Sequence, residues 1–322
     1  MSLDPSPRPV TPPVVTPEPP ADGTGASRGV PRGLRVWAVL LAAVSAVATI
    51  AVWRYFVGST TGQALDQTAF DGATYGRGKL WVVAEPVLDV VSISFVVIGL
   101  VVAVGIALVR RRWNLAGQVV ALVAGANLTT QLLKKVVLER PDLGYDAWGN
   151  SLPSGHTTVA ASVSVAVVLA VPRRMRPLVA LCGAAYTVAT GISTLVGQWH
   201  RPSDVIAAML VVLAWGALVC AFSSESSLDP LPDRSTVDGR GRPGHSSSTA
   251  LTVALLAVLG VAAGAIAGWA FVETAAVVSG EAASNDRTGF IAYVGGAGGV
   301  VAVTALVFAL LLGLRQGVAR PR

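Results

Sequence analysis

Two of the three histidines in the sequence stand in short polar segments that could carry out nucleophilic or proton-transfer chemistry. His200 precedes Asp204 by four residues, about one helical turn, so the carboxylate can reach the imidazole. Such a pair would fix the tautomer and leave the other ring nitrogen available as a nucleophile. Structural pairing of an Asp at a membrane helix end with a neighbouring His is the alternative.

The segment Pro153-Ser154-Gly155-His156 is a second polar cluster, and it stands at the start of an apolar stretch. Ser is a good helix N-cap, and the free N–H groups of a first helical turn form an anion site that the helix dipole strengthens. Gly155 would let an anion approach the backbone closely, and His156 would point at it. A capped helix with an incidental histidine is the alternative, and this cluster alone does not decide between the two.

Four basic residues stand near these clusters, namely Lys134, Lys135, Arg140 and Arg201. Lys and Arg can neutralise a phosphate near the membrane surface through charge-assisted hydrogen bonds. Snorkelling of the long side chains to lipid headgroups is the alternative. Because the sequence has no Asp, Glu and His cluster at metal-ligand spacing, we expect neither a metal nor a cofactor.

The composition indicates that membrane helices must position these residues. Only 13% of the chain is charged and 53% is hydrophobic, whereas soluble domains carry roughly 25% charged residues. This balance excludes a soluble enzyme and a wholly disordered chain. Eight stretches approach the length of about 20 apolar residues that crosses a bilayer. They are 35–57, 87–109, 115–134, 155–171, 177–197, 203–222, 249–272 and 289–314.

Arginine clusters predict the orientation of the spans. They comprise Arg28, Arg32 and Arg35; Arg110, Arg111 and Arg112; Arg173, Arg174 and Arg176; and Arg315, Arg320 and Arg322. With eight crossings all four clusters lie on one side, which the positive-inside rule makes the cytoplasm. Both termini are then cytoplasmic and the histidine clusters extracytoplasmic. Arginines placed in this way also argue against nucleic acid as a partner.

We expect an all-α, polytopic membrane helix bundle with four parts. These are a disordered cytoplasmic tail (1–33), a six-helix membrane core (34–222), a cytoplasmic linker (223–248), and two additional transmembrane helices with a short cytoplasmic tail (249–322). The loop 58–86 is expected either as an interfacial lid or lipid guide or as a plain connection. Gly-rich surfaces in 249–272 and 289–314 should pack onto the core, with a homo-oligomer contact as the alternative.

Together, the three polar clusters resemble the type 2 phosphatidic acid phosphatase superfamily, membrane lipid phosphatases related to vanadium haloperoxidases. That family shows three ordered motifs, Lys-x6-Arg-Pro, Pro-Ser-Gly-His and Ser-Arg-x5-His-x3-Asp. Residues 153–156 match the second motif in full, and Ser193, His200 and Asp204 match the third at the right spacing. The resemblance implies a six-helix phosphatase core.

The resemblance also implies roles for individual residues. His200 would attack phosphorus and form a phosphohistidine, Asp204 would orient it, and His156 would protonate the leaving lipid oxygen. The phosphate oxygens would be held by Ser154, Gly155, Lys134 and Arg140.

The sequence departs from the family pattern in two places. Thr194 stands where the third motif has an arginine that binds phosphate, and five residues separate Lys134 from Arg140 in the first motif instead of six. Phosphate neutralisation would then be rebuilt from Lys134, Lys135, Arg140 and Arg201, with Arg201 as the substitute for the missing arginine. Reduced or lost activity is the competing explanation.

These expectations add up to a lipid phosphate phosphatase of the bacterial cytoplasmic membrane, with its active site on the extracytoplasmic face. Its partners would be membrane lipids and a lipid phosphate or diphosphate, such as a polyprenyl carrier or a phosphoglycerolipid. Two alternatives stay open. One is a phosphotransferase that passes the phosphoryl group to an acceptor other than water, and the other is a non-enzymatic lipid-binding or flipping protein on a decayed phosphatase scaffold.

Overall fold

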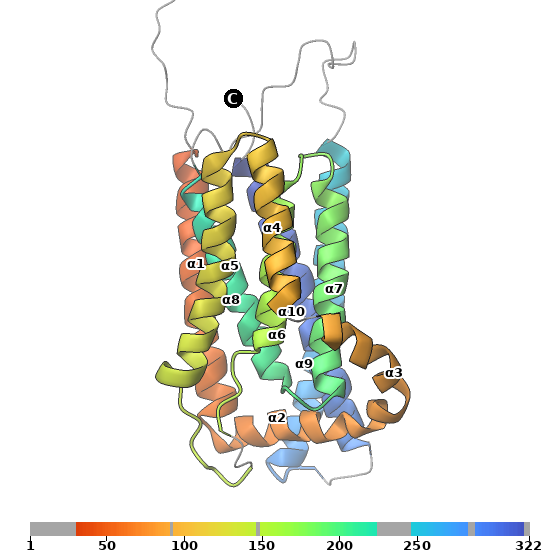
Figure 1. Cartoon of the computed structure of the whole chain (residues 1–322). Coiled ribbons are helices and arrows are strands. Elements are labelled where there is room, and N and C mark those ends of the chain that lie inside the picture. The colour runs from red at the N-terminus through yellow and green to blue at the C-terminus, as the bar shows by residue number, and fades with distance from the viewer. Residues whose placement is uncertain (1–29, 91–92, 146–148, 224–245, 283–286, 319–322) are drawn as a thin grey trace, which may run out of the picture.

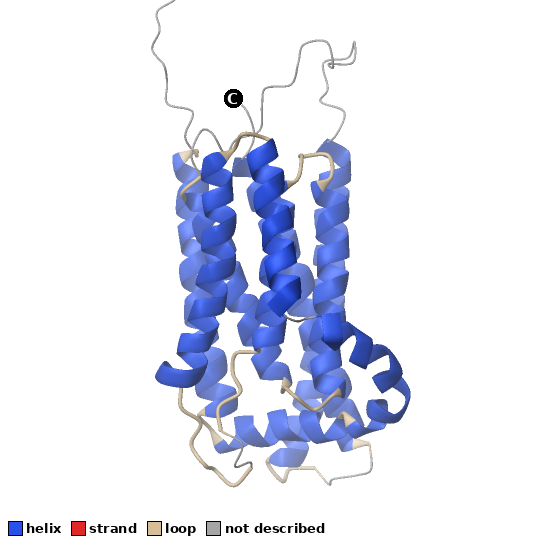
Figure 2. Cartoon of the chain, in the orientation of Figure 1, coloured by secondary structure: helices blue, strands red, loops and turns tan. Residues whose placement is uncertain are grey.

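The protein is an all-α helix bundle, as the sequence predicts. The computed structural model describes residues 30–90, 93–145, 149–223, 246–282 and 287–318. Within these ranges every regular element is a helix and no strand occurs (Figure 2). The predicted tail 1–33 and linker 223–248 lie mostly outside the described residues.

Within the described residues, the upright helices stand side by side and form the bundle (Figure 1). They are α1 (Arg32–Val52), α4 (Ile93–Val109), α5 (Trp113–Leu132), α6 (Gly155–Ala170), α7 (Arg176–Val196), α8 (Pro202–Ala221), α9 (Ser246–Val278) and α10 (Thr288–Val318). Each of the eight predicted spans coincides with one of these helices over most of its length. Two short π-helical turns, η1 (Trp53–Val57) and η2 (Leu133–Val137), extend α1 and α5.

The chain is an integral membrane protein. Among the described residues, six helical segments are long and apolar enough to cross a bilayer: Arg32–Val57, Trp113–Val137, Arg176–Val196, Pro202–Ala221, Ser248–Val278 and Thr288–Val318. The outer surfaces of α1 and α9 expose large apolar side chains such as Val47 and Val258, which a lipid environment tolerates and water does not. The apolar segment of α4 and the whole of α6 are shorter. The 16 residues of α6 extend roughly 24 Å, less than the hydrocarbon thickness of about 30 Å.

The segment 58–86, expected as a loop, is largely helical, and its predicted role as a lid or lipid guide stays a prediction. It forms α2 (Thr60–Gly72) and most of α3 (Thr74–Val90). Ser59 caps α2, because its Oγ accepts a hydrogen bond from the Gly62 N–H at 3.1 Å. Figure 1 shows α2 lying across one end of the bundle, with α3 curving up its side.

The predicted start of the second span, at residue 87, is wrong. Residues 87–90 belong to α3, and the upright helix α4 begins at Ile93. The reason is visible in the composition of α3, which carries exposed Glu85 and Asp89 and contains Pro86. Charged, exposed side chains keep this helix out of the apolar interior.

The two C-terminal helices pack on each other and on the core, as their small residues predict. A Cβ added to Gly295 would come within 2.5 Å of Ala270 Cβ on α9. A Cβ added to Gly296 would come within 2.5 Å of Pro202 Cγ at the start of α8. Glycine is therefore what allows α10 to approach both helices at this level of the bundle.

One end of the bundle collects the arginine clusters. The start of α1, the α4–α5 and α6–α7 connections and the end of α10 all lie at the end marked C in Figure 1. Several of these arginines also serve the fold. Arg110 Nη1 donates to the Ala170 carbonyl at 2.6 Å, and the wholly buried Arg315 donates through Nη2 to the Leu169 carbonyl at 3.2 Å. The α2 end, which holds the histidine clusters, is the opposite end of the bundle.

Candidate active site

His200 lies in the turn that connects α7 to α8. The N–H groups of Trp199 and His200 both donate to the Thr194 carbonyl, at 2.9 and 3.3 Å, and Gln198 adopts a left-handed backbone conformation with φ of 55°. These features reverse the chain tightly after α7. His200 is thereby held at the end of the bundle with only 6% of its surface exposed.

Asp204 holds the imidazole of His200, as the four-residue spacing predicts. The distance between His200 Nδ1 and Asp204 Oδ2 is 3.0 Å, and the same oxygen accepts the Arg201 backbone N–H at 3.0 Å. Pro202 begins α8, so Asp204 lies in the first helical turn, where the helix dipole stabilises a carboxylate. Because Asp204 engages Nδ1, Nε2 is the ring nitrogen left for chemistry.

The start of α6 lies directly against this turn. Ser154 caps α6 by accepting the Thr157 N–H at 3.3 Å, and its own N–H donates to the Asp204 carbonyl at 2.9 Å. The second and third motifs are thus joined through the backbone. The rings of His156 and His200 lie edge to face, with their centroids 6.2 Å apart. The two histidines and the free N–H groups of a helix start therefore share one site.

Lys134 is a predicted basic ligand that the structure places near the His–Asp pair. It lies half-buried on η2, within electrostatic reach of Asp204 and His156. The loop after η2 is tied back by Asn150, whose Nδ2 donates to the carbonyls of Leu138 and Leu152 at 2.9 and 3.0 Å. π-Helical turns inside α-helices are often found at functional sites because they redirect side chains.

Lys135 and Arg140, two other predicted basic ligands, differ in exposure. Lys135 is exposed, and Arg140 is partly exposed in the loop after η2. Their roles as phosphate ligands stay predictions.

Arg201, the predicted substitute for the missing arginine, is engaged by α2. Its Nε and Nη2 both donate to Gln67 Oε1, at 3.2 and 2.9 Å, and its guanidinium lies over the Phe70 ring at 5.2 Å. Nη1 lies 3.4 Å from Ser151 Oγ. The hydroxyl of Thr194 is not directed at the Arg201 guanidinium. It is buried and donates to the Gly191 carbonyl of its own helix at 2.7 Å.

Two tryptophans form one wall of the site. Trp199 is 48% exposed, its ring lies 5.4 Å from that of His156, and Trp81 of α3 meets it edge-on at 6.4 Å. A tryptophan at the end of a membrane helix is typical of the interfacial aromatic belt. The structure adds that Trp199 contacts a candidate catalytic residue.

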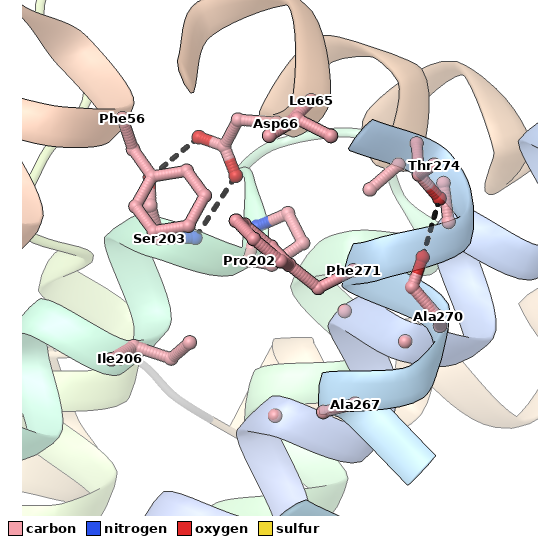
Figure 3. Close-up of a pocket in the computed structure, with 15 residues that line it drawn as sticks. Phe56, Leu65, Asp66, Pro202, Ser203, Ile206, Ala267, Ala270, Phe271 and Thr274 are labelled. Atoms are coloured by element: carbon pink, nitrogen blue, oxygen red, sulfur yellow. Dashed lines mark hydrogen bonds between the residues drawn. The ribbon is translucent and has the colours of Figure 1, made fainter. Parts of the chain in front are cut away.

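Sequence reasoning missed the contribution of α2. Asp66 is 2% exposed and accepts two hydrogen bonds from Ser203, from Oγ at 2.5 Å and from the backbone N–H at 3.2 Å (Figure 3). Burial, and next the charge of Asp204, raise the pKa of Asp66 from 3.8 to about 7. The polar residues Gln63, Asp66 and Gln67 recur at helical spacing, and that pattern could have revealed a polar helix face.

A small apolar cavity of about 130 Å³ lies behind Asp66, between α2, α8, α9 and α10 (Figure 3). Phe56, Leu65, Ile206 and Phe271 are among the side chains that line it, and Asp66 is its one charged lining residue.

A comparison with protein families finds a match over part of the chain. The family model described as "PAP2 superfamily" matches residues 115–227, which run from α5 to just beyond α8. Among solved structures, the chain is similar to the first transmembrane PAP2 type phosphatidylglycerolphosphate phosphatase from Bacillus subtilis. The identity is 22% over 59% of this chain and 94% of that chain, with a TM-score of 0.44. No curated protein sequence matches the chain.

Proposed function

Because residues 115–227 match the model of the PAP2 superfamily, we propose that the protein is a membrane phosphatase that hydrolyses the phosphate monoester or diphosphate of a lipid. The observation that carries this proposal is the pairing of His200 Nδ1 with Asp204 Oδ2 at 3.0 Å, opposite His156 and at the start of α6. This arrangement supplies a nucleophile, an orienting carboxylate, a proton donor and an anion site within one small volume.

The chemistry follows from the positions of these groups. His200 Nε2 attacks phosphorus, an N–P bond forms, and the P–O bond to the lipid breaks. His156 donates a proton to the departing lipid oxygen. Water, deprotonated by His156, then attacks the phosphohistidine and releases inorganic phosphate and neutral His200. Asp204 stabilises the charge that the imidazole gains in the first step and loses in the second.

Charge on the phosphoryl oxygens is stabilised by the start of α6 and by Lys134. Ser154 Oγ accepts from Thr157, which leaves its hydroxyl proton available for a phosphate oxygen. The Gly155 N–H lies in the first turn, and a Cβ added there would meet only the Gln131 side-chain amide, at 3.7 Å. An anion can therefore approach this turn closely.

The site is proposed to face the extracytoplasmic side of a bacterial cytoplasmic membrane. It lies at the end of the bundle opposite the arginine clusters, which the positive-inside rule assigns to the cytoplasm. A lipid whose phosphate lies at headgroup depth would reach His200 past the half-exposed Trp199. Polyprenyl carriers and phosphoglycerolipids both meet this requirement.

A second candidate, a lipid-binding or flipping protein without activity, is favoured by one observation. Thr194 occupies the position of a family phosphate ligand, and its hydroxyl is directed to its own helix. The intact geometry of His156, His200 and Asp204 supports the enzyme, because structural pairing of Asp204 with His200 does not require a second histidine beside them.

The test uses the purified full chain in detergent with a panel of lipid monophosphates and diphosphates, measuring released phosphate. The change His200→Ala should lower kcat by about 10³-fold or more, because no nucleophile remains. His245→Ala, which removes the third histidine, is the matched control and should keep full activity. A phosphorylated acceptor formed without release of free phosphate would indicate the phosphotransferase. No turnover of any lipid by the wild type would favour the non-enzymatic protein.

Trapping the intermediate sharpens the assignment. A lipid labelled with ³²P at the phosphate should transfer label to the wild-type protein, and the label should be stable to alkali and labile to acid, as a phosphohistidine is. Label that persists in His200→Ala would contradict the choice of nucleophile.

A further inference from the structure

The helix α2 lies outside the residues that match the family, yet it supplies a row of polar side chains to the site. Gln63, Asp66 and Gln67 are three and four residues apart, so one face of α2 presents all of them. Gln63 Nε2 donates to the Pro141 carbonyl at 2.9 Å, in the loop that follows η2. Gln67 accepts from Arg201, and Asp66 accepts from Ser203. Each of the three residues therefore fastens a segment of the site.

Asp66 makes the most specific of these contacts. Its two oxygens accept from both donors of Ser203, the hydroxyl and the backbone N–H. Ser203 is the residue directly before Asp204, and Arg201, which Gln67 holds, is the residue directly after His200. Ser203 and Arg201, which both lie between His200 and Asp204 in the sequence, are thus hydrogen-bonded to α2. Their partners on α2 are 137 and 134 residues away in the sequence.

The use of a carboxyl group at this position has an energetic cost. Asp66 is buried, it lies near Asp204, and on its other side it borders the apolar cavity, where Thr274 donates to its own helix (Figure 3). A buried acidic group that faces another acid and apolar side chains destabilises the fold. An amide would avoid most of that cost but could accept only one of the two hydrogen bonds from Ser203.

We propose that Asp66 is a positioning residue for phosphoryl transfer, which it serves by holding Ser203 and so fixing the first turn of α8 that carries Asp204 and orients His200. This proposal rests on the proposed phosphatase function for its catalytic consequence. The two hydrogen bonds from Ser203 to Asp66 fix the orientation of the first turn of α8. The hydrogen bonds from Arg201 to Gln67 fix the residue directly before this turn. Misplacement of a reacting group by about 1 Å can cost about 100-fold in rate, so a distant tether can control kcat.

The test compares Asp66→Asn and Ser203→Ala with the wild type in detergent, using kcat and KM for the best lipid of the panel. Each variant should lower kcat about tenfold to 100-fold, while KM changes less than about threefold, because the tether acts on orientation and not on lipid binding. The double variant should be no worse than the more damaged single variant, since both remove one interaction. Asp89→Asn, which neutralises an exposed acid at the end of α3, is the matched control and should leave both constants unchanged.

A second measurement does not depend on turnover. Diethyl pyrocarbonate acylates accessible imidazole nitrogens, and mass spectrometry reports the rate at His200 alone. The buried His200 should react about threefold faster or more in Asp66→Asn and Ser203→Ala, because a loosened turn opens more often, and at the wild-type rate in Asp89→Asn.

The outcomes separate the two proposals. If the wild type turns over no lipid but Asp66→Asn still accelerates acylation of His200, the phosphatase proposal fails and the positioning role of Asp66 stands. If kcat and the acylation rate in both variants equal those of the control, the positioning role is overturned. It is also overturned if activity falls only in proportion to the loss of folded protein, which size-exclusion chromatography measures. Should Asp66→Asn fail to fold, Ser203→Ala carries the same test.

Discussion

The two ends of α6 meet charged groups in opposite ways. At its start, His156 lies beside His200 and within electrostatic reach of Lys134, and the Ser154 N–H donates to the Asp204 carbonyl. At its end, the carbonyls of Leu169 and Ala170 accept from Arg315 and Arg110. The helix dipole favours the cations at the end of α6, and it would equally favour an anion bound at the start.

The difference lies in how completely each end is satisfied by the protein itself. The C-terminal end receives its cations from the chain, so its polar groups are already paired and serve stability. At the N-terminal end, the proposed function has Ser154, the first-turn N–H groups and Lys134 bind the phosphate of a substrate. The same physics of a helix terminus therefore yields a structural cap at one end and a candidate active site at the other.

The largest expected effect is on activity at the N-terminal end of α6. Asp204→Asn should lower kcat by about 10³-fold, because the amide can hold the imidazole in the wrong tautomer. The thermal midpoint of unfolding should stay close to the wild-type value. Steady-state kinetics with a lipid phosphate checks this, and a variant with more than about a tenth of wild-type kcat would contradict an orienting role.

At the C-terminal end the expectation is reversed. Arg315→Ala should destabilise the fold by about 2–4 kcal/mol, because Arg315 is wholly buried and its removal leaves a void and the Leu169 carbonyl without its donor. The kcat per folded molecule should stay near the wild-type value. Thermal unfolding of the detergent-solubilised protein and kinetics on the same sample measure both quantities, and a selective loss of kcat would contradict the division between the two ends.

A smaller effect separates two roles of Arg201. If it acts mainly by attachment to α2, Arg201→Ala and Gln67→Ala should lower kcat alike, by about tenfold, and vanadate inhibition should be unchanged. If it binds phosphate as the substitute for the missing arginine, only Arg201→Ala should weaken inhibition by vanadate, a phosphate analogue. Dose–response curves for the two variants decide between these roles.

The smallest effect concerns pH and stability. The folded pKa of Asp66, about 7, lies above its ordinary value of 3.8, with burial and Asp204 raising it and Ser203 and Arg201 opposing the rise. The folded state then binds the proton more tightly, so this contribution to stability is fully present below pH 3.8 and is lost as the pH rises through 7. Between pH 5 and 8 the thermal midpoint of the wild type should fall by a few degrees more than that of Asp66→Asn. Equal slopes for the two proteins would contradict the raised pKa.

Local sequence patterns were sufficient to predict much of the molecule. The helices follow from apolar length, and the His200–Asp204 contact follows from four-residue spacing in a helical turn. The start of α6 follows from Ser154 as N-cap. Each of these features depends on residues within one or two turns of each other, so backbone geometry alone determines them.

The predictions failed or stayed open where partners are distant in sequence. The segment 58–86 was not recognised as helical because α2 is short and only weakly apolar, and its polar face is explained only by contacts with Pro141, Arg201 and Ser203. The boundary at residue 87 was missed because the charged, proline-containing end of α3 adjoins an apolar run.

The sequence by itself determined the membrane helices, the collection of arginines at one end, and the residue types of the site. Hydrophobic length and helical spacing encode these features locally. Only the tertiary structure decided that His156 faces His200, that Arg201 contacts α2, and that Asp66 holds Ser203. These contacts depend on how the helices pack, which is set by the sum of many apolar contacts and not by any local pattern.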